Sequence, residues 1–196
     1  MSVTAPEGFV ASGCHAGIKR RRFDMALLAT EDRKPVPCAA VFTQNKFVAP
    51  PVELDRALLG ASGGKAAAVI VNSGNANAGT GEAGYRDAEA MGAAAADALG
   101  IDKGGVLVCS TGIIGTPLAM KPILAALARQ LPGELRRGFQ DQVHRQRRAD
   151  DPGRADQNLA RIDAECVARS SAHELSVLVA RCSGARVGVA GIDDDR

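Results

Sequence analysis

The sequence has no tryptophan, one tyrosine and five phenylalanines among its 196 residues. Aromatic residues make up only 3% of the chain, so it offers few of the flat side chains on which unstacked nucleic-acid bases are usually held. No apolar run approaches the roughly 18 to 20 residues that a membrane-spanning helix needs. We therefore expect neither a nucleic-acid partner nor a membrane partner.

The chain also has no large excess of positive or negative charge, since 24 basic and 22 acidic residues leave a net charge of +2. Four consecutive basic residues, 19–22, are the exception, and we interpret them as a solvated turn before a strand. The five cysteines are an odd number and lack Cys-x-x-Cys or Cys/His spacing, which argues against a disulfide framework and a metal site. The first residues form no secretion leader, so we expect a cytoplasmic location.

Apolar patterning predicts an α/β protein with one ordinary domain. The runs 23–30 and 38–43 flank a polar turn and predict a β-hairpin. Two further runs, 66–72 and 106–110, are continuously apolar and predict strands buried on both faces.

Three segments, 52–59, 82–99 and 119–131, have the composition and spacing of helices. Because the helix 82–99 joins the two buried strands, we expect those strands to be parallel, so that the loops after them emerge at one edge of the sheet. Open α/β sheets bind their ligands at that edge.

The chain changes character beyond about Pro132. Every lysine lies at or before Lys121, and the basic residues after it are all arginine. We therefore divide the chain into 1–131 and a divergent tail, 132–196, in which 175–181 and 186–192 predict a weak hairpin. The composition of the tail fits the hypothesis of a shifted reading frame in a GC-rich gene.

Small polar residues follow both buried strands, at 72–81 and 110–115. Ser110-Thr111-Gly112 offers a hydroxyl and successive backbone N–H groups, which suit a small anion or a developing oxyanion. The same residues also suit a tight turn before the next helix. Thr111 is alternatively a nucleophile, although no histidine lies in a recognisable partner motif.

Two rival motifs have simpler interpretations. The segment 79–84 matches the dinucleotide pattern GxGxxG, but its first glycine does not follow the strand directly and the next strand ends without an acidic ribose ligand, so we expect no nicotinamide or flavin cofactor. Cys109 lies inside an apolar strand, where a cysteine is more often a small core residue than a reactive thiolate.

Several segments of the sequence match motifs of one known family, and they occur in the same order along the chain. They are Gly8-Phe9 with Ala16-Gly17-Ile18-Lys19; Ala40-Val41-Phe42-Thr43-Gln44-Asn45 with Ala49-Pro50-Pro51-Val52; Val71-Asn72-Ser73-Gly74-Asn75-Ala76-Asn77-Ala78 with Thr80-Gly81; and Cys109-Ser110-Thr111-Gly112-Ile113-Ile114-Gly115 with Leu118-Ala119-Met120. Together they resemble the front part of the ornithine acetyltransferases (ArgJ, bifunctional glutamate N-acetyltransferases).

This resemblance implies a layered α-β-β-α sandwich of the DmpA/ArgJ-like type, incomplete here. It also implies acetyl transfer from N-acetylornithine to glutamate in arginine biosynthesis, by a precursor that cuts itself ahead of a threonine nucleophile. The residues matching Thr111 and Gly112 would form the oxyanion hole. Family members assemble from two α and two β chains, need no cofactor, and in some cases accept acetyl-coenzyme A as a substrate.

The resemblance stops near Leu131. The family continues with a Met-Thr-Thr-Asp-Thr segment, a Lys-Gly-x-Gly-Met segment and a Met-Ala-Thr segment that carries the nucleophile, and none of these occurs at 132–196. We therefore expect this chain alone to be inactive, or to depend on a separate β chain. The alternative is a non-catalytic small-molecule binding or interaction protein derived from the family.

Overall fold

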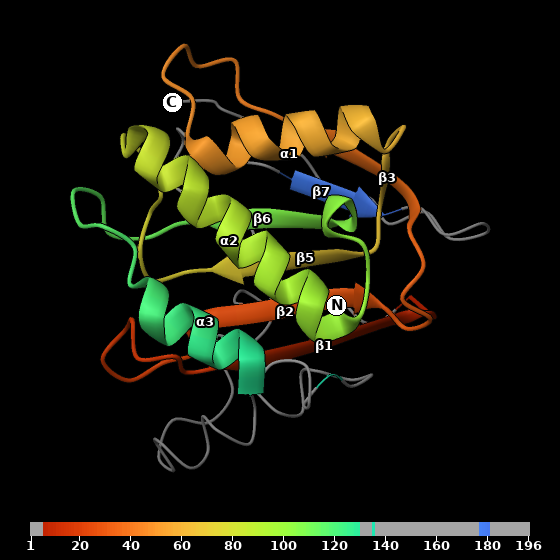
Figure 1. Cartoon of the computed structure of the whole chain (residues 1–196), viewed down its shortest axis with the longest axis horizontal. Helices are drawn as coiled ribbons and strands as arrows, with labels where there is room; N and C mark the ends of the chain where they lie inside the picture. Colours follow the sequence, from red (N-terminus) through yellow and green to blue (C-terminus); the bar gives the residue numbers. More distant parts are fainter. Residues whose placement is uncertain (1–5, 130–134, 136–176, 181–196) are drawn as a thin grey trace, which may run out of the picture.

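The structure is a computed structural model that describes residues 6–129, 135 and 177–180. Its elements follow in the order β1 (Phe9–Cys14), β2 (Met25–Thr30), β3 (Val36–Val41), α1 (Pro50–Ala61), β4 (Lys65–Ala66), β5 (Ala68–Asn72), α2 (Gly81–Leu99), the 3-10 turn η1 (Lys103–Gly105), β6 (Val106–Ser110), α3 (Met120–Arg129) and β7 (Val177–Ala180). Figure 1 shows the strands with the three helices across them.

A four-stranded sheet with the order β1-β2-β5-β6 forms the centre of this part of the molecule. β1, β2 and β5 are antiparallel neighbours, whereas β5 and β6 are parallel. The register places Ala68 opposite Val106 and Asn72 opposite Ser110. This register confirms the predicted parallel pair. The two strands can be parallel because α2 carries the chain back across the sheet between them.

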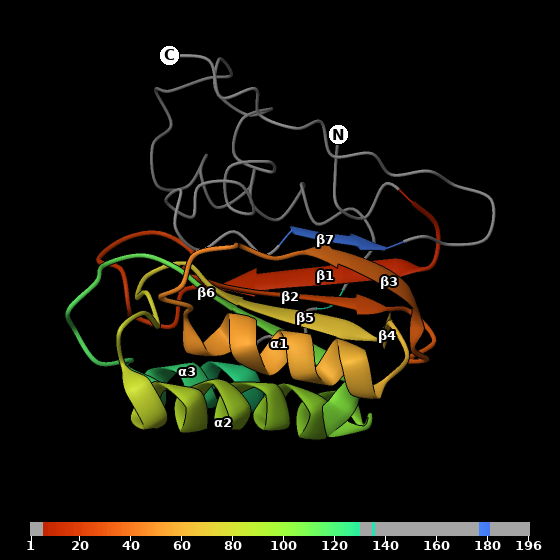
Figure 2. The same cartoon turned by 90° about the horizontal axis from the view of Figure 1, so that it is seen from above.

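One face of this sheet packs against the helices (Figure 2). Leu27 and Ile70 from the strands and Met91 and Ile123 from α2 and α3 are fully buried in the same core cluster. Burying a side chain of this size contributes about 1.5 to 3 kcal/mol. Small residues let α2 come close to the sheet, since a Cβ at Gly92 would lie 3.2 Å from a methyl group of Val108.

A second sheet, with the order β4-β3-β7, forms a separate layer on the other side of the first (Figure 2). β3 pairs antiparallel with β4 and β7, and β2 pairs with β1 and β5. Both strands of the predicted hairpin exist, but their pairing is wrong, because the turn between them carries the chain from one sheet to the other. One helical layer and two β layers agree with the expected α/β sandwich.

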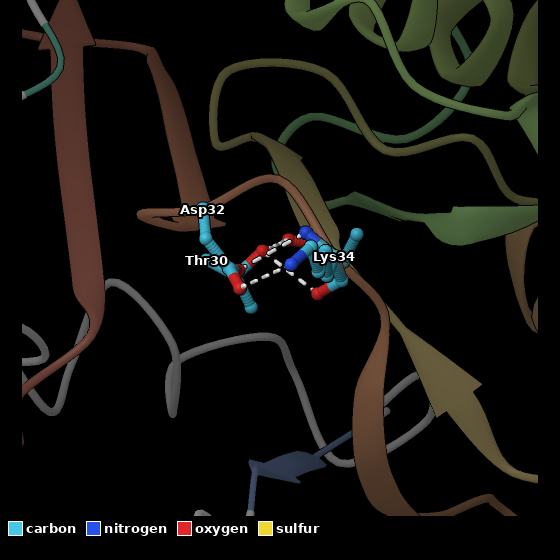
Figure 3. A network of polar contacts seen from close by, with 4 residues as sticks. Thr30, Asp32 and Lys34 are labelled. Carbon is cyan, nitrogen blue, oxygen red and sulfur yellow. Dashed lines mark hydrogen bonds and ion pairs between the residues drawn. The ribbon is translucent and has the colours of Figure 1, made fainter.

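The turn from β2 to β3 is fixed by short-range hydrogen bonds (Figure 3). The Thr30 hydroxyl donates to the Lys34 carbonyl at 3.0 Å, and the Lys34 N–H donates to the Asp32 carboxylate at 3.1 Å. Arg33 has a φ of 63°, a left-handed conformation that reverses the chain at some cost in strain. Since β2 is antiparallel to β5, this turn lies at the edge opposite to the loop that follows β5.

The predicted helices are confirmed as α1, α2 and α3, and both buried strands as β5 and β6. β1 was missed, because three of its six residues are Ala11, Ser12 and Gly13, which have no strand preference. In the tail, Val177–Ala180 is a strand, but it pairs with β3; the second predicted strand, 186–192, lies outside the described residues. No helix in the described part of the chain is long and apolar enough to cross a membrane.

Candidate oxyanion site

Three loops meet at the edge where β5 and β6 end, on the left in Figure 1. They are 73–80 after β5, 111–119 after β6, and 15–24 between β1 and β2. The first two follow parallel strands, so they leave the sheet side by side. An isolated parallel bridge between Asn75 and Ile113 continues their pairing beyond the strands.

Asn72, the last residue of β5, holds this edge together although its side chain is fully buried. Its amide nitrogen donates to the Asn75 carbonyl and to the Ser110 hydroxyl, both at 2.9 Å. Its amide oxygen accepts from the backbone N–H groups of Gly74 at 2.9 Å and Asn75 at 3.3 Å. The side chain thereby uses both donors and both acceptor positions that an asparagine has.

Further bonds fasten the loop after β6 onto the loop after β5. The Asn75 amide donates to the carbonyls of Thr116 and Pro117 at 2.9 and 3.3 Å. The backbone of Ile113 donates to the Gly74 carbonyl at 3.2 Å and accepts from the Ala76 N–H at 3.0 Å. The peptide groups around Gly112 are consequently held on both sides.

Only glycine fits at position 112. Its φ is 137°, a value that residues with a side chain rarely adopt. A Cβ there would also collide with the Gly74 carbonyl and lie 2.7 Å from the backbone nitrogen of Asn75. The close approach of the two loops therefore requires a residue without a side chain.

The hydrogen bonds identify which donors remain for a ligand. The Thr111 N–H donates to the Asn72 carbonyl at 2.8 Å, and the Ile113 N–H is engaged by Gly74. Neither the Gly112 N–H nor the Thr111 hydroxyl bonds to any other described residue. Thr111 is half-buried and Gly112 exposed. The expected run of successive N–H donors is therefore wrong, and only the Gly112 N–H and the Thr111 hydroxyl remain available for a ligand among these groups.

The third loop is organised by Asp24, whose carboxylate is fully buried. It accepts the backbone N–H groups of Ala16 at 2.6 Å, Ile18 at 2.7 Å and Lys19 at 2.9 Å. The Lys19 ammonium in turn donates to the Ser73 hydroxyl at 3.0 Å. Residues 20–22 are exposed, as the solvated-turn interpretation expected, but Lys19 is half-buried and faces the loop after β5.

Cys109, the rival nucleophile, lies near the buried carboxylate of Asp55 and packs beside Val69 and Leu107. Burial and, to a smaller extent, the Asp55 charge raise the pKa of the Cys109 thiol to about 12. Because the thiolate is the reactive form, this thiol is a poor nucleophile at neutral pH. Cys109 is half-buried and packs against this small apolar cluster, which supports a packing role.

The GxGxxG segment has a packing explanation. A Cβ at Gly84 would collide with the side chains of Thr80 and Asn77. The Asn77 amide donates to the Gly84 carbonyl at 2.7 Å and its oxygen accepts from the Thr80 hydroxyl at 2.5 Å. The glycine thereby allows a fully buried asparagine to fasten the first turn of α2. No cluster of metal-binding side chains occurs within 6–129, 135 and 177–180.

Sequence reasoning located Thr111 and Gly112 and placed 72–77 at the same edge, where the structure brings them together. It assigned no role to Asn72 and did not single out Asp24. A polar residue that ends an apolar strand, as Asn72 does, was the available signal for the first. Asp24 could not be found in this way, since the groups that it binds are defined by the shape of the loop.

These features define a class, namely an α/β layered protein with two hydrogen-bond donors that have no partner among the described residues, at the carboxyl edge of two parallel strands. Comparison with known proteins identifies the family. The sequence model of the ArgJ family matches residues 10–149. The arginine biosynthesis bifunctional protein ArgJ of Caldanaerobacter subterraneus subsp. tengcongensis is 49% identical over 125 residues, which are 64% of this chain and 30% of that protein. The protein of the same name from Chlorobaculum tepidum is 48% identical over 122 residues, 62% of this chain and 30% of that one.

Two crystal structures are also similar. Ornithine acetyltransferase from Mycobacterium tuberculosis, complexed with ornithine, has a TM-score of 0.65 and 40% identity, covering 70% of this chain and 72% of that one. ArgJ from Bacillus halodurans has a TM-score of 0.62 and 42% identity, covering 66% of each chain. The chain belongs to the ArgJ family, and the resemblance to the ornithine acetyltransferases is confirmed. It spans 30% of the length of the curated relatives that it matches.

Proposed function

We propose that this chain supplies the oxyanion-stabilising part of an acetyltransferase site that moves an acetyl group from N-acetylornithine to glutamate. Family membership supports the reaction, since the relatives are arginine biosynthesis proteins. The observation that carries the proposal is the pair formed by the Gly112 N–H and the Thr111 hydroxyl. Both donors are free of other described residues, and the buried Asn72 network holds them in place.

The chemistry follows from that pair. When a nucleophilic threonine adds to the acetyl carbonyl, the π electrons move onto the oxygen, which becomes an oxyanion until the ornithine amine leaves. Donors held in position stabilise this charge without having to reorganise, and one such donor is typically worth roughly 3 to 4 kcal/mol of transition-state stabilisation. Thr111 and Gly112 would act at that step, first with the donor and then with glutamate as acceptor.

The nucleophile must come from elsewhere, because the motif that carries it in the family does not occur in this sequence. The proposal therefore includes a β chain that completes the site, in an assembly of two α and two β chains, and no turnover by the isolated chain. Acetyl-coenzyme A as a second acetyl donor, catalysis without a cofactor and a cytoplasmic location are further parts of the proposal.

The test is a titration of the glycine-labelled chain with N-acetylornithine, followed by the backbone amide signals in ¹⁵N NMR. The Gly112 signal should shift with saturation, whereas Gly100, at the far end of α2, should not. Thr111→Val keeps the shape of the side chain but removes the hydroxyl donor, so it should weaken binding. A Gly112 signal that ignores N-acetylornithine at every concentration would refute the proposal.

The missing nucleophile motif favours a second candidate, a non-catalytic binding protein that has kept the two loops. The encoding DNA separates the two possibilities. If another reading frame beyond Leu131 restores the missing motifs, the chain derives from a damaged enzyme; if no frame does so, the tail is genuine and the binding protein gains support.

A further inference from the structure

The Lys19 ammonium is a cation with unused hydrogen-bonding capacity beside the candidate oxyanion site. It has three donors, and one of them is given to the Ser73 hydroxyl at 3.0 Å. Within the described part of the chain no carboxylate lies within ion-pair distance of it, since the ion pairs there are Asp32–Lys34 and Glu82–Arg86. The nearby Asp24 carboxylate is occupied by three backbone N–H groups.

The position of this lysine is fixed by its surroundings. Its backbone N–H is held by Asp24, and its carbonyl lies 2.7 Å from a ring nitrogen of His15. The preceding Ile18 packs directly on Gly74, where a Cβ would collide with the isoleucine side chain. A half-buried ammonium that is restrained in this way loses little additional freedom when it binds a ligand.

The same contacts connect Lys19 to the oxyanion donors. Ser73, its hydrogen-bond partner, precedes Gly74, and the Gly74 peptide is the surface against which Gly112 packs. Two contacts therefore connect the ammonium to Gly112, one through the Ser73 hydroxyl and one through the Gly74 peptide.

We propose that the Lys19 ammonium forms a subsite for the α-carboxylate of an amino-acid substrate. The Ser73 hydroxyl positions the ammonium, since it accepts from Lys19 and donates its own proton to the Asp24 carbonyl at 3.3 Å. The inference rests on the proposed function and makes its substrate requirement more specific. In N-acetylornithine and in glutamate, the α-carboxylate is attached two bonds from the nitrogen that loses or gains the acetyl group. One cation beside the oxyanion donors therefore suits both the acetyl donor and the acetyl acceptor.

The residues that follow Lys19 support the entry of an anion. Arg20, Arg21 and Arg22 are exposed and have no ion-pair partner within the described residues. A run of like charges of this kind raises the local concentration of anionic ligands and is screened by salt. Lys19 differs from these arginines because it is half-buried and fixed to the loop after β5.

The experiment compares N-acetylornithine with its carboxamide, N-acetylornithinamide, as ligands of the full chain. Dissociation constants come from the Gly112 amide shift in the parent chain and in Lys19→Gln, Lys19→Arg and Arg21→Gln. A hydrogen bond to a charged group typically contributes a factor of roughly 10 or more in affinity. We expect the parent chain to bind the acid at least about 10-fold more tightly than the amide, and Lys19→Gln to abolish this preference.

The other variants show whether the effect of Lys19→Gln comes from a lost contact with the carboxylate, from a disturbed structure or from the loss of one positive charge. Lys19→Arg should keep the preference, since a guanidinium also binds a carboxylate. Arg21→Gln removes the same charge from the same loop and should also keep it. Weaker binding of both ligands by the same factor in Lys19→Gln would indicate a purely structural role and overturn the inference.

Failure of the subsite and failure of the proposed function give different results. If the acid binds at Gly112 but Lys19→Gln does not change the preference over the amide, the subsite alone is refuted. If neither ligand shifts Gly112 in the parent chain, the proposed function is refuted, and the subsite that rests on it is refuted as well.

Discussion

A buried carboxylate beside β6 should make the stability of this chain depend on pH. Asp55, on α1, is 2% exposed and accepts the Val108 N–H at 2.9 Å, so that α1 covers the outer edge of β6. Burial raises the pKa of Asp55 from 3.8 to about 7, and the hydrogen bond from Val108 opposes part of that rise. The folded chain therefore keeps a proton on Asp55 that the unfolded chain has lost.

The sign and size of the effect follow from that difference. Between pH of about 4 and 7 the folded state binds more protons than the unfolded state, so the free energy of unfolding falls as pH rises. A shift of about three pKa units corresponds to roughly 4 kcal/mol. The stability that the chain has with Asp55 protonated is fully present below a pH of about 4, and it is lost once the pH has risen through 7. The neighbouring thiols do not titrate in this range, because burial, and secondarily Asp55, raise the pKa of Cys38 to about 11 and that of Cys109 to about 12.

Asp55→Asn removes the ionisable group and keeps an oxygen acceptor for Val108. Urea unfolding at pH 4.5, 6, 7 and 8.5 should show the variant gaining stability relative to the parent chain as pH rises, by up to roughly 4 kcal/mol. Asp97→Asn, an exposed substitution on α2, is the control and should stay within about 0.5 kcal/mol throughout. A stability difference between Asp55→Asn and the parent chain that does not change with pH would refute the reasoning.

Three further predictions concern the loops and the thiol. Gly112→Ala should lower the free energy of unfolding by roughly 2 to 5 kcal/mol in a urea titration, because the new Cβ collides with the backbone and the φ is positive. Gly100→Ala has a positive φ but open space around the Cβ, so it should lower the free energy of unfolding by only about 1 to 2 kcal/mol. Equal losses in the two variants would contradict this explanation. Asn72→Asp should lower the free energy of unfolding by roughly 2 to 4 kcal/mol at pH 7, because it removes two buried hydrogen-bond donors. An unchanged unfolding temperature in calorimetry would argue against a stabilising role of the Asn72 network. Native Cys109 should react with iodoacetamide at pH 7.5 far more slowly than in urea, as measured by peptide mass spectrometry, and similar rates would exclude a raised pKa.

The elements that sequence could predict are those whose signal is local. The runs 66–72 and 106–110 are apolar throughout, and the alanine-rich helix between them leaves a parallel pair as the ordinary solution. That pairing also predicted that the loops containing Asn75 and Thr111 meet at one edge, as the structure shows.

The features that sequence could not predict depend on partners far apart in the chain. Nothing between 23 and 43 indicates that two adjacent strands join different sheets. Likewise, Ser110-Thr111-Gly112 suggests several N–H donors, and only the pairing of the Thr111 N–H with Asn72 shows that one of them is already used. The position of Lys19, on which its proposed role depends, also could not be predicted, since it is set by a loop that Asp24 organises and by a hydroxyl from another loop.

The central claim is that the Thr111 hydroxyl and the Gly112 N–H bind an oxyanion more strongly than a neutral carbonyl oxygen. The most direct measurement compares the affinity of the chain for N-acetylornithine with its affinity for the methylphosphonyl analogue, whose tetrahedral phosphorus carries an anionic oxygen in place of the carbonyl oxygen. Tetrahedral analogues of this kind bind oxyanion sites about 100-fold or more tightly than substrates. We predict such a preference in the parent chain and its loss in Thr111→Val; equal affinities for the two ligands in the parent chain would contradict the account.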